Sequence, residues 1–237
     1  MNNKNYRYVD IILGLFVAVL IISNIASSAK IVDWGFSIRD IPLAFDAGTL
    51  LFPISYIFGD ILTEVYGYKR SRRVIWTGFF SLALAAVVFW VVGLLPGEAT
   101  WQDYAGDNAY QAILGGMSSG GIVFASLAAY WLGEFSNSFV LAKMKVLTNG
   151  RHLWARTIGS TLVGEFIDTV IFVVVASAFG IFPWSLFLTL TVANYIFKVG
   201  MEALMTPVTY VVVGALKRSE HEDVYDRDTN FNPFVVE

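Results

Sequence analysis

Charged and amide side chains interrupt several stretches of the sequence that are otherwise apolar. Glu165 and Asp168 are three positions apart, and Lys198 and Glu202 are four apart, so each pair shares one face of a helix. A charge is stable in apolar surroundings only when it is paired or hydrated, so these side chains are expected to converge. The candidate binding residues are Asn24, Glu134, Asn137, Glu165, Asp168, Asn194, Lys198 and Glu202.

Acids outnumber bases in this set. Lys198 alone cannot neutralise four acidic side chains, so the surplus must be protonated, hydrated or completed by a ligand that supplies hydrogen-bond donors. A flat heterocycle with adjacent N–H groups suits a carboxylate, and an asparagine can bind its neighbouring edge. Two alternatives stay open: Lys198 and Glu202 belong to a structural ion network, and Asn24 makes a helix–helix hydrogen bond.

A second acidic pair, Asp60 and Glu64, lies one helical turn apart and just before a run of basic residues. One interpretation is a charge lock with Arg70, Arg72 or Arg73. The other is a gate or a proton relay, because ionisable groups within apolar helices mark such pathways.

The composition places these residues in a membrane. Of the 237 residues, 56% are apolar and only 15% are charged, against about a quarter in soluble domains. The sequence has no cysteine, its two histidines (His152 and His221) lie outside the apolar runs, and no catalytic or nucleotide-binding motif is present. We therefore expect no enzyme, no metal, no cofactor and no nucleic acid partner. Any pumping must draw on an ion gradient or on another subunit.

The apolar runs predict six membrane-spanning helices of about 20 residues each. Basic residues between them fall mainly on one side, so both termini are expected in the cytoplasm. The predicted fold class is an all-α membrane protein, with one six-helix bundle over residues 1–218 and an acidic, disordered cytoplasmic tail at 219–237. The expected helices are Val9–Ala29, Leu43–Tyr66, Val74–Leu95, Ile122–Leu141, Thr157–Phe179 and Trp184–Leu216.

An internal echo links two of these helices. Gly133–Ser138 and Gly164–Thr169 share the pattern G-E-F-x-[ND]-[ST], 31 residues apart. Because the two helices run in opposite directions, such a repeat places similar polar groups at one depth on facing helices. The alternative is a chance match.

Further motifs extend along the chain. The segment that begins at Phe52 carries Phe52, Pro53, Tyr56, Asp60, Thr63, Glu64, Tyr66, Gly67 and Lys69. Elsewhere the pattern includes Asn24, Lys30, Ser126, residues 134–145, residues 164–172, Lys198, Pro207 and Tyr210. Together, over about residues 8–217, these motifs resemble the queuosine precursor transporters, a vitamin uptake transporter family.

The resemblance implies a bundle akin to the substrate-binding components of energy-coupling-factor transporters, in a bacterial inner membrane. It implies import of 7-cyano-7-deazaguanine (preQ0) and 7-aminomethyl-7-deazaguanine (preQ1) for the queuosine modification of tRNA. A guanine-like edge offers two adjacent donors to a carboxylate. We place Glu165 or Asp168 on that edge and Asn137 or Asn194 on the carbonyl side.

A second interpretation is a proton- or ion-coupled transporter of another nucleobase-like or vitamin-like solute that uses the same acids. In either case the expected partners are a small-molecule substrate and membrane lipid. A second copy of the chain or an ATP-driven energising module is a further expected partner.

Overall fold

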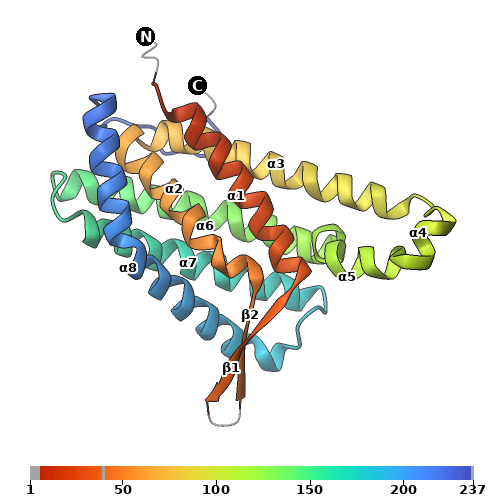
Figure 1. Cartoon of the computed structure of the whole chain (residues 1–237). Helices are drawn as coiled ribbons and strands as arrows, with labels where there is room; N and C mark the ends of the chain where they lie inside the picture. Colours follow the sequence, from red (N-terminus) through yellow and green to blue (C-terminus); the bar gives the residue numbers. More distant parts are fainter. Residues whose placement is uncertain (1–5, 39–40, 236–237) are drawn as a thin grey trace.

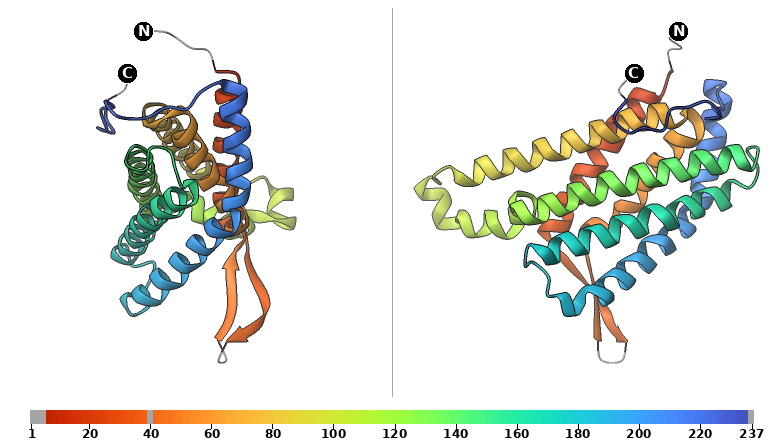
Figure 2. Two further views of the ribbon diagram at one scale, coloured as in Figure 1. Left: turned by 90° about the vertical axis from the view of Figure 1, so that its left-hand side faces the viewer. Right: turned by 180° about the vertical axis from the view of Figure 1, so that it is seen from behind.

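The structure is a computed structural model that describes residues 6–38 and 41–235. Within these residues, six helices cross the bundle in alternating directions, and both termini lie at one end, which we call the terminal end (Figure 1). A β-hairpin projects from the opposite end, the hairpin end (Figure 2). The crossing helices are α1 (Val9–Ala29), α2 (Phe52–Tyr66), α3 (Tyr68–Leu94), α6 (Gly120–Leu147), α7 (Leu153–Ala178) and α8 (Phe187–Glu220).

Five helical stretches of the described chain are long and apolar enough to span a membrane. They correspond to five of the six predicted spans, and one of them joins α6 to the preceding α5 (Gly106–Ser118). The exception is α2, whose 15 residues rise only about 22 Å, less than the ~30 Å of a hydrocarbon core. The remaining short helix is α4 (Ala99–Tyr104), between α3 and α5.

The bundle is helical, as the sequence predicts, but the prediction of a helix that begins at Leu43 is wrong. The chain instead forms the antiparallel strands β1 (Ile31–Ile38) and β2 (Ile41–Asp46), then the short 3-10 helix η1 (Ala47–Leu50). Five of the eight residues of β1 are β-branched or aromatic, and such residues favour strands. Gly35, with φ of +74°, occupies an irregularity of the ladder. The hairpin leaves only the second half of the predicted helix for α2.

The helix α2 is enclosed by α1, α3, α6 and α8. Residues 59–68 are all buried, and Asp60 and Glu64 have no exposed surface. The Thr63 hydroxyl links three helices, because it lies 2.9 Å from the hydroxyl of Ser71 and 3.0 Å from that of Ser138. A helix that carries two acids thus lies in the interior of the bundle, where its charges do not face lipid.

The helices α6 and α7 make the most extensive helix–helix contact of the bundle. A Cβ atom on Gly133 would lie 2.7 Å from the Cβ of Asp168, and one on Gly164 would lie 2.6 Å from the Cβ of Asn137. Small residues let helix backbones approach this closely in membranes. The two copies of the sequence echo therefore pack against each other reciprocally.

Residues 221–235 lie across the terminal end, although the sequence predicts a disordered tail there. The Arg72 guanidinium donates to the Asn232 carbonyl at 2.8 Å. The Trp76 indole donates to the Pro233 carbonyl, also at 2.8 Å. The tail therefore packs against the start of α3.

Candidate functional site

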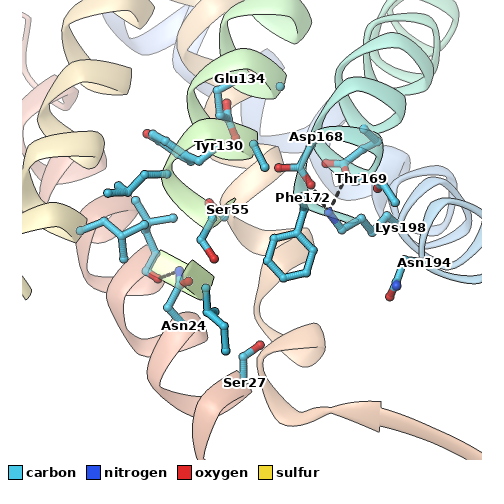
Figure 3. Close-up of a pocket in the computed structure, with 18 of the residues that line it drawn as sticks. Asn24, Ser27, Ser55, Tyr130, Glu134, Asp168, Thr169, Phe172, Asn194 and Lys198 are labelled. Carbon is cyan, nitrogen blue, oxygen red and sulfur yellow. Dashed lines mark hydrogen bonds and ion pairs between the residues drawn. The ribbon is translucent and has the colours of Figure 1, made fainter. Parts of the chain in front are cut away.

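A cavity of about 700 Å³ lies among α1, α2, α3, α5, α6, α7 and α8. This volume is in the range typical of small-ligand sites. Figure 3 shows Asn24 and Ser27 of α1 on one side of the cavity and Asp168 and Lys198 on the other. Seven of the eight predicted binding residues line it: Asn24, Glu134, Asn137, Glu165, Asp168, Asn194 and Lys198.

Lys198 is the one lysine or arginine among the residues that line the cavity, and it joins both acids of α7. Its Nζ atom lies 3.0 Å from Glu165 Oε2 and hydrogen-bonds to Asp168 Oδ2 (Figure 3). The Tyr56 hydroxyl of α2 also hydrogen-bonds to Glu165. Lys198 therefore pairs across to α7 rather than along its own helix with Glu202.

Glu134 and Asn137 bring α6 to the same cavity. The Asn137 amide Nδ2 donates to Asp60 Oδ1 at 2.9 Å. Within the described chain, Glu134 Oε2 and Asn137 Oδ1 are buried and have no hydrogen-bond partner. Most buried polar atoms are paired, so open acceptors beside a cavity suit a solute that brings donors.

The other predicted binding residues differ in their surroundings. Glu202 does not line the cavity and is only 1% exposed. Asn24 and Asn194 do line it, but each donates one N–H to a carbonyl of its own helix, at Leu20 and Leu190 respectively. The cavity therefore holds seven of the expected side chains, while Glu202 lies deeper in the protein.

Glu64 forms a separate cluster at the terminal end. Its Oε1 atom lies 2.7 Å from Arg156 Nη2, 2.7 Å from Lys217 Nζ and 3.7 Å from Lys145 Nζ. Lys217 and Lys145 also reach Asp223 of the tail, at 2.8 Å and 2.5 Å. We call these five residues the Glu64 cluster; it joins α2, α6, α7, α8 and the tail.

The predicted charge lock of Glu64 with the basic run at the start of α3 is therefore wrong in its partners. Arg72 is buried and donates to carbonyls of the tail, and the Arg70 guanidinium lies 4.0 Å from the centre of the Tyr6 ring. Sequence reasoning assigned no site role to Lys145 or Arg156. The sequence does indicate that Lys145 is buried, because its spacing places it on the same face of α6 as Glu134, Ser138 and Leu141, which are buried.

Tyr56 is another site residue to which sequence reasoning gave no role in binding. It lines the cavity, and its ring centre lies 5.8 Å from Lys198 Nζ. Its spacing of four residues from Asp60 indicates that the two share a face of α2, which could have placed it near the polar interior.

A cavity with mainly apolar walls and a few convergent polar side chains, inside an apolar bundle, is typical of a small-molecule binding site. Residues 46–212 match the family described as "Putative vitamin uptake transporter", and the chain belongs to this family. It is therefore a member of a transporter family and not an enzyme.

The chain is similar to the "Probable queuosine precursor transporter" of Bacillus subtilis (strain 168), with 25% identity over 209 residues that cover 88% of this chain and 87% of that protein. It is also similar to the "Queuosine precursor transporter" of Escherichia coli (strain K12), with 24% identity over 157 residues, 64% of this chain and 65% of that one. No solved structure matches the chain. The likeness to the substrate-binding components of energy-coupling-factor transporters thus stays a prediction.

Proposed function

We propose that this protein imports the 7-deazaguanine precursors of queuosine, 7-cyano-7-deazaguanine and 7-aminomethyl-7-deazaguanine, across a bacterial inner membrane. The observation that carries the proposal is the excess of acceptors at the cavity, where Glu134, Glu165 and Asp168 face a single base, Lys198. The names of the two relatives support the same class of substrate.

The chemistry of the base fits these acceptors. A 7-deazaguanine presents an N1–H beside a 2-amino group, and one carboxylate accepts both in a bidentate arrangement. Glu165 and Asp168 are the side chains that we assign to this edge, because a carboxylate that pairs with a lysine still has lone pairs to offer. The base carbonyl accepts from the second N–H of Asn137 or Asn194, since the first is engaged within the protein.

The Glu64 cluster supplies the cytoplasmic gate of this mechanism. It ties the ends of α2, α6, α7 and α8 together by ion pairs to one carboxylate. While these pairs are intact, the helices cannot separate at the terminal end, so the cavity is closed on the side to which the solute is released.

The test is uptake of radiolabelled 7-cyano-7-deazaguanine by cells that lack both precursor synthesis and their own transporter. Glu165→Gln and Asp168→Asn should each lower uptake at least tenfold at equal amounts of protein in the membrane. The physical reason is that each amide presents a donor N–H where the base also presents a donor. Binding of both precursors to the purified protein, measured by calorimetry, should weaken in parallel.

Asp103→Asn is the matched control, because Asp103 is an exposed acid on α4, away from the cavity. It should keep wild-type uptake. If the wild-type protein is present in the membrane and takes up neither precursor, the proposed substrate is wrong. If both cavity variants keep full uptake, the binding site lies elsewhere.

A further inference from the structure

Two acids, Asp60 and Glu202, lie between the cavity and the Glu64 cluster, but they neither line the cavity nor belong to the cluster. Asp60 of α2 has no exposed surface and Glu202 of α8 is 1% exposed, and the two helices pack against each other. In the part of the chain that the structure describes, Asp60 Oδ2 and both carboxylate oxygens of Glu202 are buried without a hydrogen-bond partner. The mechanism of solute binding leaves both side chains unused.

The charged groups around these acids do not neutralise them. The main electrostatic neighbours of Asp60 are acids: Glu202, Glu134 and Glu64. The main electrostatic neighbour of Glu202 is Glu165 of α7, again an acid. The nearby bases are engaged elsewhere, because Lys198 binds the two acids of α7 and the three bases of the Glu64 cluster bind Glu64.

A carboxylate in these surroundings requires a positive charge or a proton, because its burial as an anion without a partner is strongly unfavourable. A proton is the better fit. No group of three or more His, Cys, Asp or Glu side chains among the described residues is arranged to hold a metal ion. Protonation neutralises a buried carboxyl without any further ligand.

Glu134 connects these acids to the cavity. It lines the cavity, and its carboxyl also lies close to the backbone of α2 beside Asp60. A Cβ atom added to Gly59, the neighbour of Asp60 in the sequence, would lie only 3.0 Å from Glu134 Oε2. Asn137 makes a second connection, because it lines the cavity and donates to Asp60. A solute that binds these two side chains therefore changes the surroundings of the buried acids.

We propose that Asp60, Glu202 and Glu134 form a proton-binding site that couples solute import to the proton gradient. This proposal rests on the proposed function. The site is neutral while the bundle is closed around it. Opening at the terminal end hydrates the acids, and the proton leaves past Glu64, one turn along α2, as the solute is released. The acids bind the next proton, together with the next solute, when the bundle is open at the hairpin end, and the loaded bundle then closes around them.

The test uses purified wild-type protein in liposomes with labelled 7-cyano-7-deazaguanine. An inward proton gradient should drive accumulation of the base, and a protonophore should abolish it. Glu202→Gln and Asp60→Asn should each lower accumulation at least tenfold but retain exchange of labelled for unlabelled base, which requires no net proton movement. Asp103→Asn, the exposed-acid control, should retain both activities.

Several results would overturn the proposal. Accumulation that persists with the protonophore, or that follows a sodium gradient without a proton gradient, excludes proton coupling. Wild-type accumulation in both variants shows that these acids carry no proton. If the wild-type protein neither accumulates nor exchanges either precursor, the proposed substrate fails instead.

A measurement without solute then tests the proton site by itself. Infrared spectra of the purified protein at neutral pH should contain the carbonyl stretch of protonated carboxyl groups. This band should lose intensity in Glu202→Gln or in Asp60→Asn, whichever variant folds, and should be unchanged in Asp103→Asn. A wild-type spectrum without the band contradicts the proposal, whatever the transported solute is.

Discussion

The interior of this protein contains two ionic regions with opposite balances of charge. Around Glu64, one buried carboxylate meets three bases, two of them also paired to Asp223. Nearer the cavity, five acids face one lysine: the acids are Asp60, Glu134, Glu165, Asp168 and Glu202, and the lysine is Lys198. The two regions are only one turn apart along α2, from Asp60 to Glu64.

The difference indicates two roles for buried charge. A buried ion pair offsets its desolvation only when its geometry is good and every partner is present. In the Glu64 cluster every charged group has an oppositely charged partner from the chain itself, so the cluster can hold the helix ends together, although Glu64 Oε2 and Arg156 Nε are buried without a hydrogen-bond partner among the described residues. The acids near the cavity have too few bases for such pairing, so their neutralisation depends on protons and on a solute that arrives from outside.

The largest expected effect is that of Glu64→Gln. It removes the one carboxylate that three bases share, so buried positive charge is left without a partner. We expect the free energy of unfolding to fall by about 3–5 kcal/mol, the usual cost of a broken buried ion pair. Unfolding in detergent micelles measures it, with Asp103→Asn as control; equal stability of Glu64→Gln and wild type would show that the cluster does not hold the helices.

The next largest loss of stability is expected for Gly164→Ala, in the contact between α6 and α7. This contact positions side chains of both ionic regions. The added methyl would lie 2.6 Å from the Cβ of Asn137, so the helices must separate. Overpacking of this kind costs about 1–3 kcal/mol. Gly200→Ala on α8 is the matched control, because nothing lies within 4 Å of its added methyl. If both variants unfold alike, the echo is not a packing contact.

Lys198→Met should cost less than the loss of Glu64, although it removes the base that pairs with both acids of α7. Asp168 keeps 20% of its side-chain surface exposed to water, and the buried Glu165 can bind a proton instead. We expect a loss of about 1–2 kcal/mol in unfolding free energy at neutral pH, diminishing as the pH is lowered. Urea titrations at several pH values test this; a loss equal to that of Glu64→Gln at every pH would erase the contrast between the two regions.

Much of the bundle and the membership of the cavity follow from the sequence. The limits of α1 agree with the prediction residue for residue, because a long and mainly apolar run has few other solutions in a membrane. Helical spacing places Glu165 and Asp168 on the same face, and both line the cavity. Spacing within one helix does not reveal its partner on another, so the pairing of Lys198 with α7 needed the structure.

Other features were outside the reach of pattern analysis. A short apolar run at residues 41–50 is ambiguous between helix and strand, and its pairing with β1 decides in favour of a hairpin. The tail is acidic enough to predict disorder, yet two of its aromatic rings pack on the bundle: Phe231 lies 4.9 Å from Tyr68 and Phe234 lies 5.4 Å from Trp131, centre to centre. A few aromatic side chains therefore outweigh the average composition of the segment.

The smallest expected effect concerns Asp223, the tail residue that completes the Glu64 cluster. Burial raises the pKa of its carboxyl, but hydrogen bonds from Lys145 and Lys217 outweigh burial and hold the pKa below its ordinary value. A lowered pKa stabilises the docked tail above the ordinary pKa of about 3.9, and this contribution is lost as the pH falls through the lower, folded-state value.

Because the Asp223 side chain is 43% exposed, Asp223→Asn should release only the tail. Hydrogen exchange of residues 221–235 at neutral pH should accelerate in Asp223→Asn, with little change in α6, whereas Asp228→Asn, at an exposed acid of the same tail, should leave it unchanged. Unaltered protection in Asp223→Asn would mean that the aromatic contacts alone hold the tail, and the Glu64 cluster would then be balanced without it.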